Sequence, residues 1–180
     1  MDGDTSGLTL EHFADDGVFP NSPLPLLYYK AALPPDSASP EAMEALFAAG
    51  GWPPAWRYTV YAYHHYHSTA HEVLGIAAGS ARLMLGGPNG RAFEVTAGDV
   101  IVIPAGVVHQ QISRSPDFLV VGGYPPGQRP DQFRGEVGDR PLADRNIAAV
   151  PLPESDPVAG RDGPLPRHWK AAAGGAGKTS

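Results

Sequence analysis

Apolar residues along the chain follow two different patterns. Between residues 57 and 124, short runs rich in β-branched and aromatic residues recur between clusters of turn residues. Closely spaced short strands of this kind are typical of antiparallel sandwiches and barrels, and we predict a jelly roll. The predicted strands cover residues 57–67, 72–78, 81–85, 91–96, 100–103, 109–113 and 118–124.

The region before residue 57 has a mixed pattern. An apolar run over residues 24–30 predicts a strand, and residues 40–49 show helical spacing, with Met43 and Phe47 on one face. Ser39 can cap that helix and Pro40 suits its first turn. This is the one helix that the pattern predicts.

The high content of glycine and proline shapes the rest of the prediction. The 180 residues include 22 Gly and 20 Pro, against usual shares of about 7% and 5%. We expect one domain with four parts: an N-terminal arm (1–54), a barrel core (55–124), an extended C-terminal wrap (125–170) and a disordered tail (171–180).

Charge and cysteine content narrow the possible functions. The net charge of -6 leaves no basic surface for phosphates, so we expect a small-molecule ligand and neither nucleic acid nor membrane. The absence of cysteine excludes disulfides and thiolate metal sites. The first residues lack a basic, then apolar, leader pattern, and there is no run of 18 apolar residues. We therefore expect a cytoplasmic protein.

The segment 64–72 reads His-His-Tyr-His-Ser-Thr-Ala-His-Glu and holds four of the seven histidines. Strand parity places His65 and His67 on one face, and His64 on the other. Imidazole and carboxylate groups bind divalent transition metals without thiolate, so the segment predicts a metal site.

A second segment strengthens this prediction. Residues 98–109 form an apolar strand, a Pro-x-Gly turn and then a histidine. Together the two segments resemble the two-motif signature of the cupin superfamily. The residues that carry the resemblance are His65, His67, Glu72, Gly79, Gly98, Pro104, Gly106 and His109.

Further stretches resemble the small, single-domain bacterial YjlB-like cupins. These are residues 63–75, 118–128, 156–157 and 162–165. The resemblance implies an all-β double-stranded β-helix, the cupin jelly-roll barrel, here with one short N-terminal helix and extended terminal arms. Thr59 departs from the Gly that usually opens the first motif, and Ser113 from the Asn that usually ends the second.

The resemblance and the strand geometry imply one metal site with four ligands, His65, His67, Glu72 and His109. Three nitrogens and one oxygen favour iron, manganese or nickel and tolerate zinc. One or two coordination positions would remain for water or substrate.

Five other residues are candidates for the surroundings of the metal. His71 is either an exposed turn residue or a hydrogen-bond partner behind the ligands. Tyr61 and Tyr63 share the parity of His65 and either fill space or donate hydrogen bonds. Gln111 either touches a substrate or lies at the exposed rim, and Ser113 shares its face.

Three functions remain open at this point. The leading one is a small-molecule metalloenzyme, a dioxygenase-like oxidoreductase acting on a small metabolite. A redox-neutral isomerase, dehydratase or decarboxylase is the enzymatic alternative, and a metabolite-binding or storage protein is the non-catalytic one. The proline-rich arms and the pairing habit of the resembled family predict a homodimer.

Overall fold

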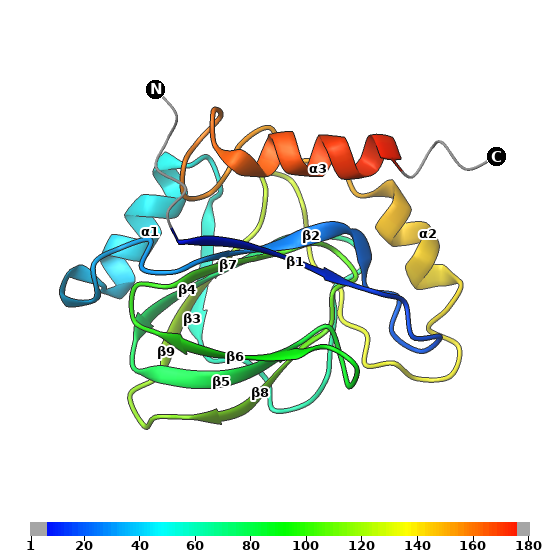
Figure 1. Ribbon diagram of the computed structural model, residues 1–180, viewed down its shortest axis with the longest axis horizontal. Coiled ribbons are helices and arrows are strands. Elements are labelled where there is room, and N and C mark those ends of the chain that lie inside the picture. The colour runs from blue at the N-terminus through cyan, green and yellow to red at the C-terminus, as the bar shows by residue number, and fades with distance from the viewer. Residues whose placement is uncertain (1–6, 176–180) are drawn as a thin grey trace.

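The computed structural model describes residues 7–175, which form nine strands and three α-helices (Figure 1). The strands are β1 (Leu8–Phe13), β2 (Ser22–Tyr29), β3 (Pro54–Tyr58), β4 (Glu72–Ala78), β5 (Ser80–Leu85), β6 (Arg91–Thr96), β7 (Val100–Ile103), β8 (His109–Arg114) and β9 (Leu119–Gly123). The helices are the 3-10 turn η1 (Pro35–Ser37), α1 (Pro40–Ala49), α2 (Leu142–Ala149) and α3 (Pro164–Gly175).

The strands form two antiparallel sheets that face each other (Figure 1). Six strands lie in the order β1-β2-β7-β4-β9-β3, and three in the order β6-β5-β8. Strand β4 is central: it pairs with β7 and with β9, in a register that sets Glu72 opposite Ile103. This two-sheet architecture is that of a jelly roll, as predicted.

One hydrophobic cluster fills the space between the sheets. Leu74 and Ile76 of β4 meet Ile101 and Ile103 of β7 and Leu83 of β5 there, all at most 2% exposed. Burying each such side chain contributes about 1.5–3 kcal/mol. Because alternate residues point to opposite faces, the apolar residues of β4 that follow Glu72 fix which way Glu72 points.

A second cluster lies on the outer face of the six-stranded sheet, beneath α1 and α3. Helix α1 forms as predicted: the Ser39 hydroxyl accepts from the Ala42 N–H at 3.0 Å. Its buried Met43 and Phe47 lie against Gly75 of β4, where a Cβ would be 2.7 Å from the Phe47 ring. Glycine at this position therefore lets the helix approach the sheet closely.

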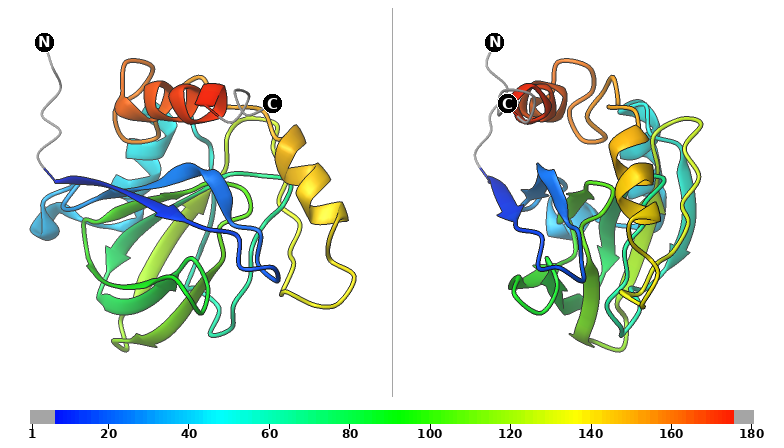
Figure 2. Two further views of the ribbon diagram at one scale, coloured as in Figure 1. Left: turned by 45° about the vertical axis from the view of Figure 1, so that its right-hand side comes forward. Right: turned by 90° about the vertical axis from the view of Figure 1, so that its right-hand side faces the viewer.

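The prediction of an extended C-terminal wrap was wrong in two places, because α2 and α3 lie within it. Helix α3 crosses one side of the molecule, above β2 (Figures 1 and 2). Leu165 and Trp169, four residues apart, are fully buried beneath it, and the Trp169 indole donates to the Pro25 carbonyl at 2.8 Å. These two buried side chains lie one turn apart and pack the helix against the sheet. The proline and glycine residues of this segment explain why the sequence did not predict a helix.

The predicted tail is also corrected, because residues 171–175 belong to α3. Residues 176–180 lie outside the described part of the chain. The predicted strand 57–67 is shorter than expected: β3 ends at Tyr58, and an irregular segment follows it to Glu72. Strand β1 was not predicted. Within residues 7–175, no helix is long and apolar enough to cross a membrane.

Candidate metal centre

The backbone brings the two histidine segments together at the end of the three-stranded sheet. His65 and His109 pair as an isolated antiparallel bridge, with N–H to carbonyl distances of 3.2 and 2.9 Å in the two directions. The His67 carbonyl accepts from the N–H of Gly106 at 2.8 Å. Gly106 has a φ of +98°, and a Cβ there would come within 2.2 Å of the Asn21 carbonyl oxygen. The turn before His109 therefore requires glycine.

Each of the three histidines donates from Nδ1 to a backbone carbonyl. The partners are Tyr63 for His65 at 3.0 Å, Asp131 for His67 at 2.6 Å, and Val107 for His109 at 3.1 Å. A carbonyl oxygen can only accept, so Nδ1 carries the hydrogen in all three rings. The neutral rings therefore present Nε2 lone pairs, which is how backbone partners orient metal-binding histidines.

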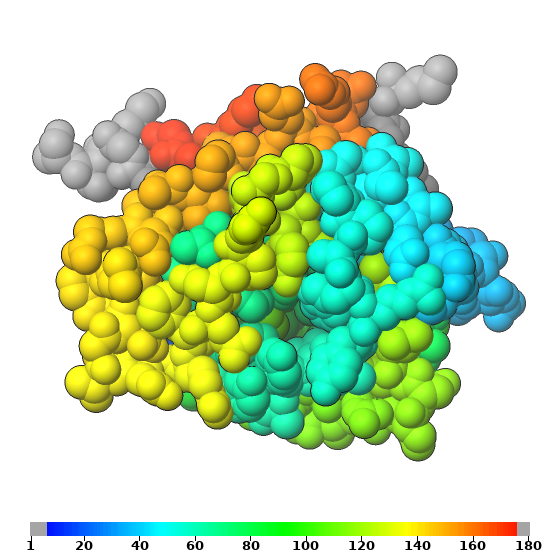
Figure 3. Space-filling model, turned by 180° about the vertical axis from the view of Figure 1, so that it is seen from behind, coloured from blue at the N-terminus to red at the C-terminus, as the bar shows by residue number. Residues whose placement is uncertain are grey.

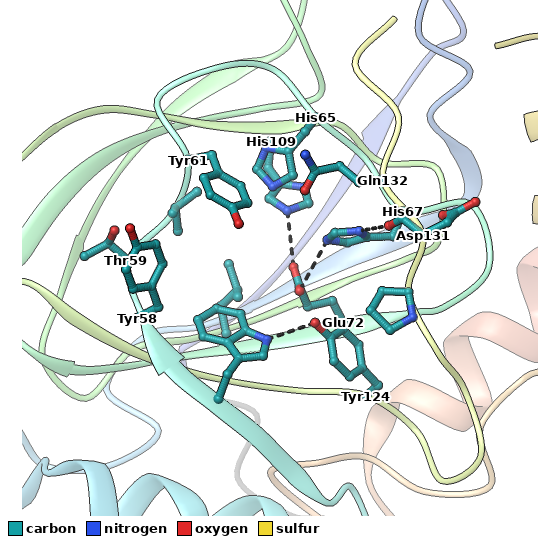
Figure 4. Close-up of a pocket in the computed structure, with 14 residues that line it drawn as sticks. Tyr58, Thr59, Tyr61, His65, His67, Glu72, His109, Tyr124, Asp131 and Gln132 are labelled. Atoms are coloured by element: carbon teal, nitrogen blue, oxygen red, sulfur yellow. Dashed lines mark hydrogen bonds and ion pairs between the residues drawn. The ribbon is translucent and has the colours of Figure 1, made fainter.

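These lone pairs converge beside a buried carboxylate. One ligand atom from each of His65, His67 and His109 lies within 4.8 Å of the others. Glu72 is 3% exposed, and its oxygens lie 3.2 Å from Nε2 of His109 and 3.4 Å from Nε2 of His67 (Figure 4). The three histidines and the adjacent carboxylate form an electron-pair-rich cluster of a kind that suits a divalent cation.

The close approach of these groups shifts the pKa values of Glu72, His67 and His65. Burial raises the pKa of Glu72, but His67 and His109 outweigh that effect and hold it well below its usual range. Burial opposes protonation of His67, yet Glu72 raises its pKa overall. Burial and the neighbouring His109 lower the pKa of His65 to about 3. Without a metal, the carboxylate therefore draws a proton to His67.

The four groups lie at one side of an open pocket of about 480 Å³. Its lining comes from β3, from the irregular segment after it, from Tyr124 and from residues 130–132. Figure 3 shows a hollow on the face where the segment after β3 and the segment 125–135 come together. The volume suits a small-molecule ligand.

Trp56 and Tyr124 both line the pocket, and Figure 4 shows Tyr124 beside Glu72. The Trp56 indole donates to the Tyr124 hydroxyl at 2.9 Å. A Cβ on Gly122 would lie 2.0 Å from the Trp56 ring, so this glycine makes room for the indole. Burial and the charge of Glu72 raise the pKa of Tyr124, so the phenol keeps its proton beside the carboxylate.

The segment after β9 supplies groups that the sequence did not single out. The Asp131 carbonyl orients His67, and its carboxylate accepts from the backbone N–H and the hydroxyl of Ser68. Asn146 of α2 donates to the same hydroxyl at 3.0 Å. No periodic pattern marks residues 125–135, because their backbone follows the pocket rim instead of a sheet or helix.

The remaining predicted residues lie in different places. His71 is 2% exposed, which contradicts the exposed-turn interpretation. Its Nδ1 accepts from the Ala105 N–H at 2.9 Å and its ring lies against Trp169, away from the ligand cluster. Burial lowers the pKa of His71 to about 4, so the ring is a neutral part of the core.

Tyr61 lines the pocket, whereas Gln111 and Ser113 do not. Ser113 is exposed on β8, opposite Arg82. Gln111 keeps a buried amide oxygen without a hydrogen-bond partner. Tyr63 stacks on Tyr61, outside the pocket lining.

Comparisons with known proteins agree with the site. The family model described as Cupin matches residues 62–127, which include all four predicted ligands. The "Uncharacterized protein YjlB" of Bacillus subtilis (strain 168) is 40% identical over 158 residues, covering 87% of this chain and 93% of that protein. The chain therefore belongs to the cupin family, among its small YjlB-like members.

Solved structures resemble parts of the chain. Acireductone dioxygenase from Bacillus anthracis, with a cadmium ion in its active centre, is 17% identical and has a TM-score of 0.41, covering 59% of this chain and 82% of that one. A DUF861 family protein from Thermotoga maritima is 20% identical with a TM-score of 0.34, covering 47% and 90%.

Proposed function

We propose that this protein is a metal-dependent enzyme that acts on a small molecule in the pocket beside His65, His67, Glu72 and His109. The observation that carries the proposal is the orientation of the three imidazoles. Each has its Nδ1 hydrogen bound to a backbone carbonyl, so the Nε2 lone pairs lie together beside a buried carboxylate.

The donor set indicates which metals would suit the site. Three imidazoles and one carboxylate include a two-histidine, one-carboxylate arrangement, which favours iron, manganese or nickel and tolerates zinc. When bound, such a metal supplies Lewis acidity and, for iron or manganese, redox chemistry with dioxygen. Pocket space beside the ligands leaves room for water or substrate.

An oxygenase-type reaction is the version we favour, because nitrogen-rich sites with one carboxylate and open positions are typical of non-haem oxygenases. The protein would orient the substrate against the aromatic wall and hold Glu72 ionised. Tyr124, whose phenol retains its proton, is placed to donate a hydrogen bond within the pocket.

Metal content is the first test. Protein purified without tag or chelator is expected to contain about one iron, manganese or nickel per chain by mass spectrometry. His109→Ala, which removes one of the ligands, is expected to weaken metal binding more than about 100-fold. His64→Ala is the matched control, because the His64 ring lies against Phe19 instead of the cluster. Full metal retention in His109→Ala would contradict the assignment.

Activity separates the three possible functions. Oxygen uptake that depends on both metal and a metabolite from a screened library supports the oxygenase. Turnover of a metabolite under nitrogen, with zinc as effective as iron, would replace it with a redox-neutral enzyme. Tight binding of a metabolite that is recovered unchanged would indicate a storage or binding protein.

We also propose that the protein is a cytoplasmic homodimer. Its proline-rich arms and the pairing habit of cupin barrels support the dimer. Light scattering at micromolar concentration is expected to give twice the chain mass, and the monomer mass would refute it.

A further inference from the structure

The pocket beside the metal ligands has an unusually aromatic wall. Four rings line it, from Trp56, Tyr58, Tyr61 and Tyr124. Their apolar surface is supplemented by Leu74 and Val60, both buried. The three tyrosines are labelled in Figure 4, where they lie around the space beside Glu72 and the histidines. A ligand in this space therefore meets rings on several sides.

Tyr61 is held as the outer layer of a stack. Its ring lies parallel to that of Tyr63, with centroids 5.0 Å apart and an angle of 10° between the planes. The Arg134 guanidinium lies over Tyr63, 3.8 Å from the ring centroid, and the Gln132 amide donates to the Tyr63 hydroxyl at 3.3 Å. Such contacts restrict the ring, so Tyr61 offers a preordered surface on the pocket side.

The charges around the pocket are unevenly distributed. Among the described residues, no lysine or arginine lines it. Arg134 is separated from it by Tyr63, and Arg57 is paired outside it with Glu41 and Glu44. The carboxylates that line it are Glu72 and Asp131, of which Asp131 is bound by Ser68. An anionic group away from the metal would find no cationic side chain on this lining.

We propose that the ligand of this pocket is a flat, unsaturated ring compound with at most one anionic group, which faces the metal, and an uncharged remainder that stacks on Tyr61. This inference rests on the proposed function for the role of the metal. The preference for a ring does not rest on the proposed function, because it depends only on the aromatic side chains that line the pocket. A volume of about 480 Å³ admits a single substituted ring.

The ring preference is tested with two probes that share a six-membered carbon ring and one carboxylate, of which one ring is flat and aromatic and the other is puckered and saturated. Benzoate is expected to bind the zinc-loaded protein about 3–10-fold more tightly than cyclohexanecarboxylate, measured by calorimetry, because it can stack. Tyr61→Leu is expected to bring the ratio close to one, while Tyr61→Phe keeps it. Ile112→Ala, an exposed change on β8 outside the pocket, is the control. Equal binding of the two probes to the wild type would overturn the ring preference.

The limit of one anionic group is tested with 4-nitrobenzoate and terephthalate. These two ions match in shape and differ by one negative charge. Terephthalate is expected to bind at least tenfold more weakly, because its second carboxylate loses water without gaining a cation. Gln132→Arg places a cation on the lining and is expected to remove most of this difference, whereas Gln132→Met is not. Tighter binding of terephthalate to the wild type would overturn this limit.

The ring preference can be tested separately from the metal site. If the protein binds no metal, the same flatness test is run on the metal-free protein with benzamide and cyclohexanecarboxamide. A preference for benzamide that is lost in Tyr61→Leu supports the ring inference even though the proposed function fails. Equal binding of both amides overturns the inference on its own.

Discussion

Two buried carboxylates of this molecule, Glu72 and Asp99, have opposite surroundings. Asp99 is fully buried and receives hydrogen bonds from the Tyr28 hydroxyl at 2.7 Å, the Lys30 ammonium at 3.0 Å and the N–H groups of Ala31 and Thr96. Every group facing it is a donor. Glu72 instead faces imidazole nitrogens that carry lone pairs when the rings are neutral.

Asp156 repeats the pattern of Asp99. It accepts from the Tyr29 hydroxyl and from the N–H groups of Val158, Ala159 and Leu165, and so ties β2 to the start of α3. Both aspartates are satisfied by the protein itself, and they organise turns. Burial alone therefore does not mark a functional carboxylate, whereas the identity of the neighbouring groups does.

The largest change in stability is expected for a substitution of Asp99, the carboxylate that is surrounded by donors. Asp99→Asn turns an acceptor oxygen into an NH₂ group that faces donors and leaves Lys30 without its partner. We expect the free energy of unfolding, measured by urea denaturation, to fall by about 3–5 kcal/mol. A loss below about 1 kcal/mol would show that this cluster tolerates missing partners.

Metal binding tests Glu72, the carboxylate that lies beside the histidines. If a cation completes the site, adding Mn²⁺ at about 100 times its dissociation constant stabilises the fold by about 2.7 kcal/mol. For a chain of this length that raises the melting temperature by about 5–10 °C. His109→Ala is expected to show almost no shift. An equal shift in the variant would mean that the metal binds elsewhere.

The same chemical change at Glu72 is expected to have a smaller effect on the metal-free fold. In Glu72→Gln the new NH₂ group can donate to a neighbouring Nε2 lone pair. Since the ion pair with protonated His67 is lost as well, the free energy of unfolding is expected to fall by about 1–2 kcal/mol, while metal binding is lost. A loss as large as that in Asp99→Asn would remove the distinction between the two carboxylates.

The metal ligands could be predicted from the sequence, and two of them open regular strands: Glu72 begins β4 and His109 begins β8. Parity places His65 and His67 together, and a Pro-x-Gly turn delivers His109. The predicted bounds of β4, β6 and β7 match those in the structure. His65 and His67 lie in the irregular segment after β3, where isolated bridges at His65 and Tyr66 keep the alternation that parity assumes. Their position was therefore predictable although the strand expected around them is not formed.

The pocket wall could not be predicted in the same way. Tyr124 and Asp131 reach the site through an irregular segment whose course depends on distant partners such as Ser68. His71 was misjudged for a similar reason: its burial results from Trp169, nearly a hundred positions later, on a helix that was itself not predicted. Long-range packing of this kind has no local signal.

The smallest expected effect concerns carboxylates at the surface. Arg140 bridges Asp15 of the N-terminal part and Asp144 of α2, with N to O distances of 2.6 Å to each. These contacts hold the pKa of both aspartates below the usual value, through their hydrogen bonds with Arg140. The three side chains are partly exposed to solvent, which screens their charges, so we expect Arg140→Gln to lower the free energy of unfolding by less than about 1 kcal/mol at pH 7.

The pH dependence of that small difference has a definite sign. A carboxyl group whose pKa is lower in the folded state stabilises the protein above its unfolded pKa, near 3.8 for aspartate. The contribution is lost as the pH falls through the lower, folded value. Urea denaturation of both proteins should therefore give a difference that is constant above about pH 5 and shrinks towards zero in stronger acid. A difference that persisted there would mean that Arg140 acts through packing and not through its charge.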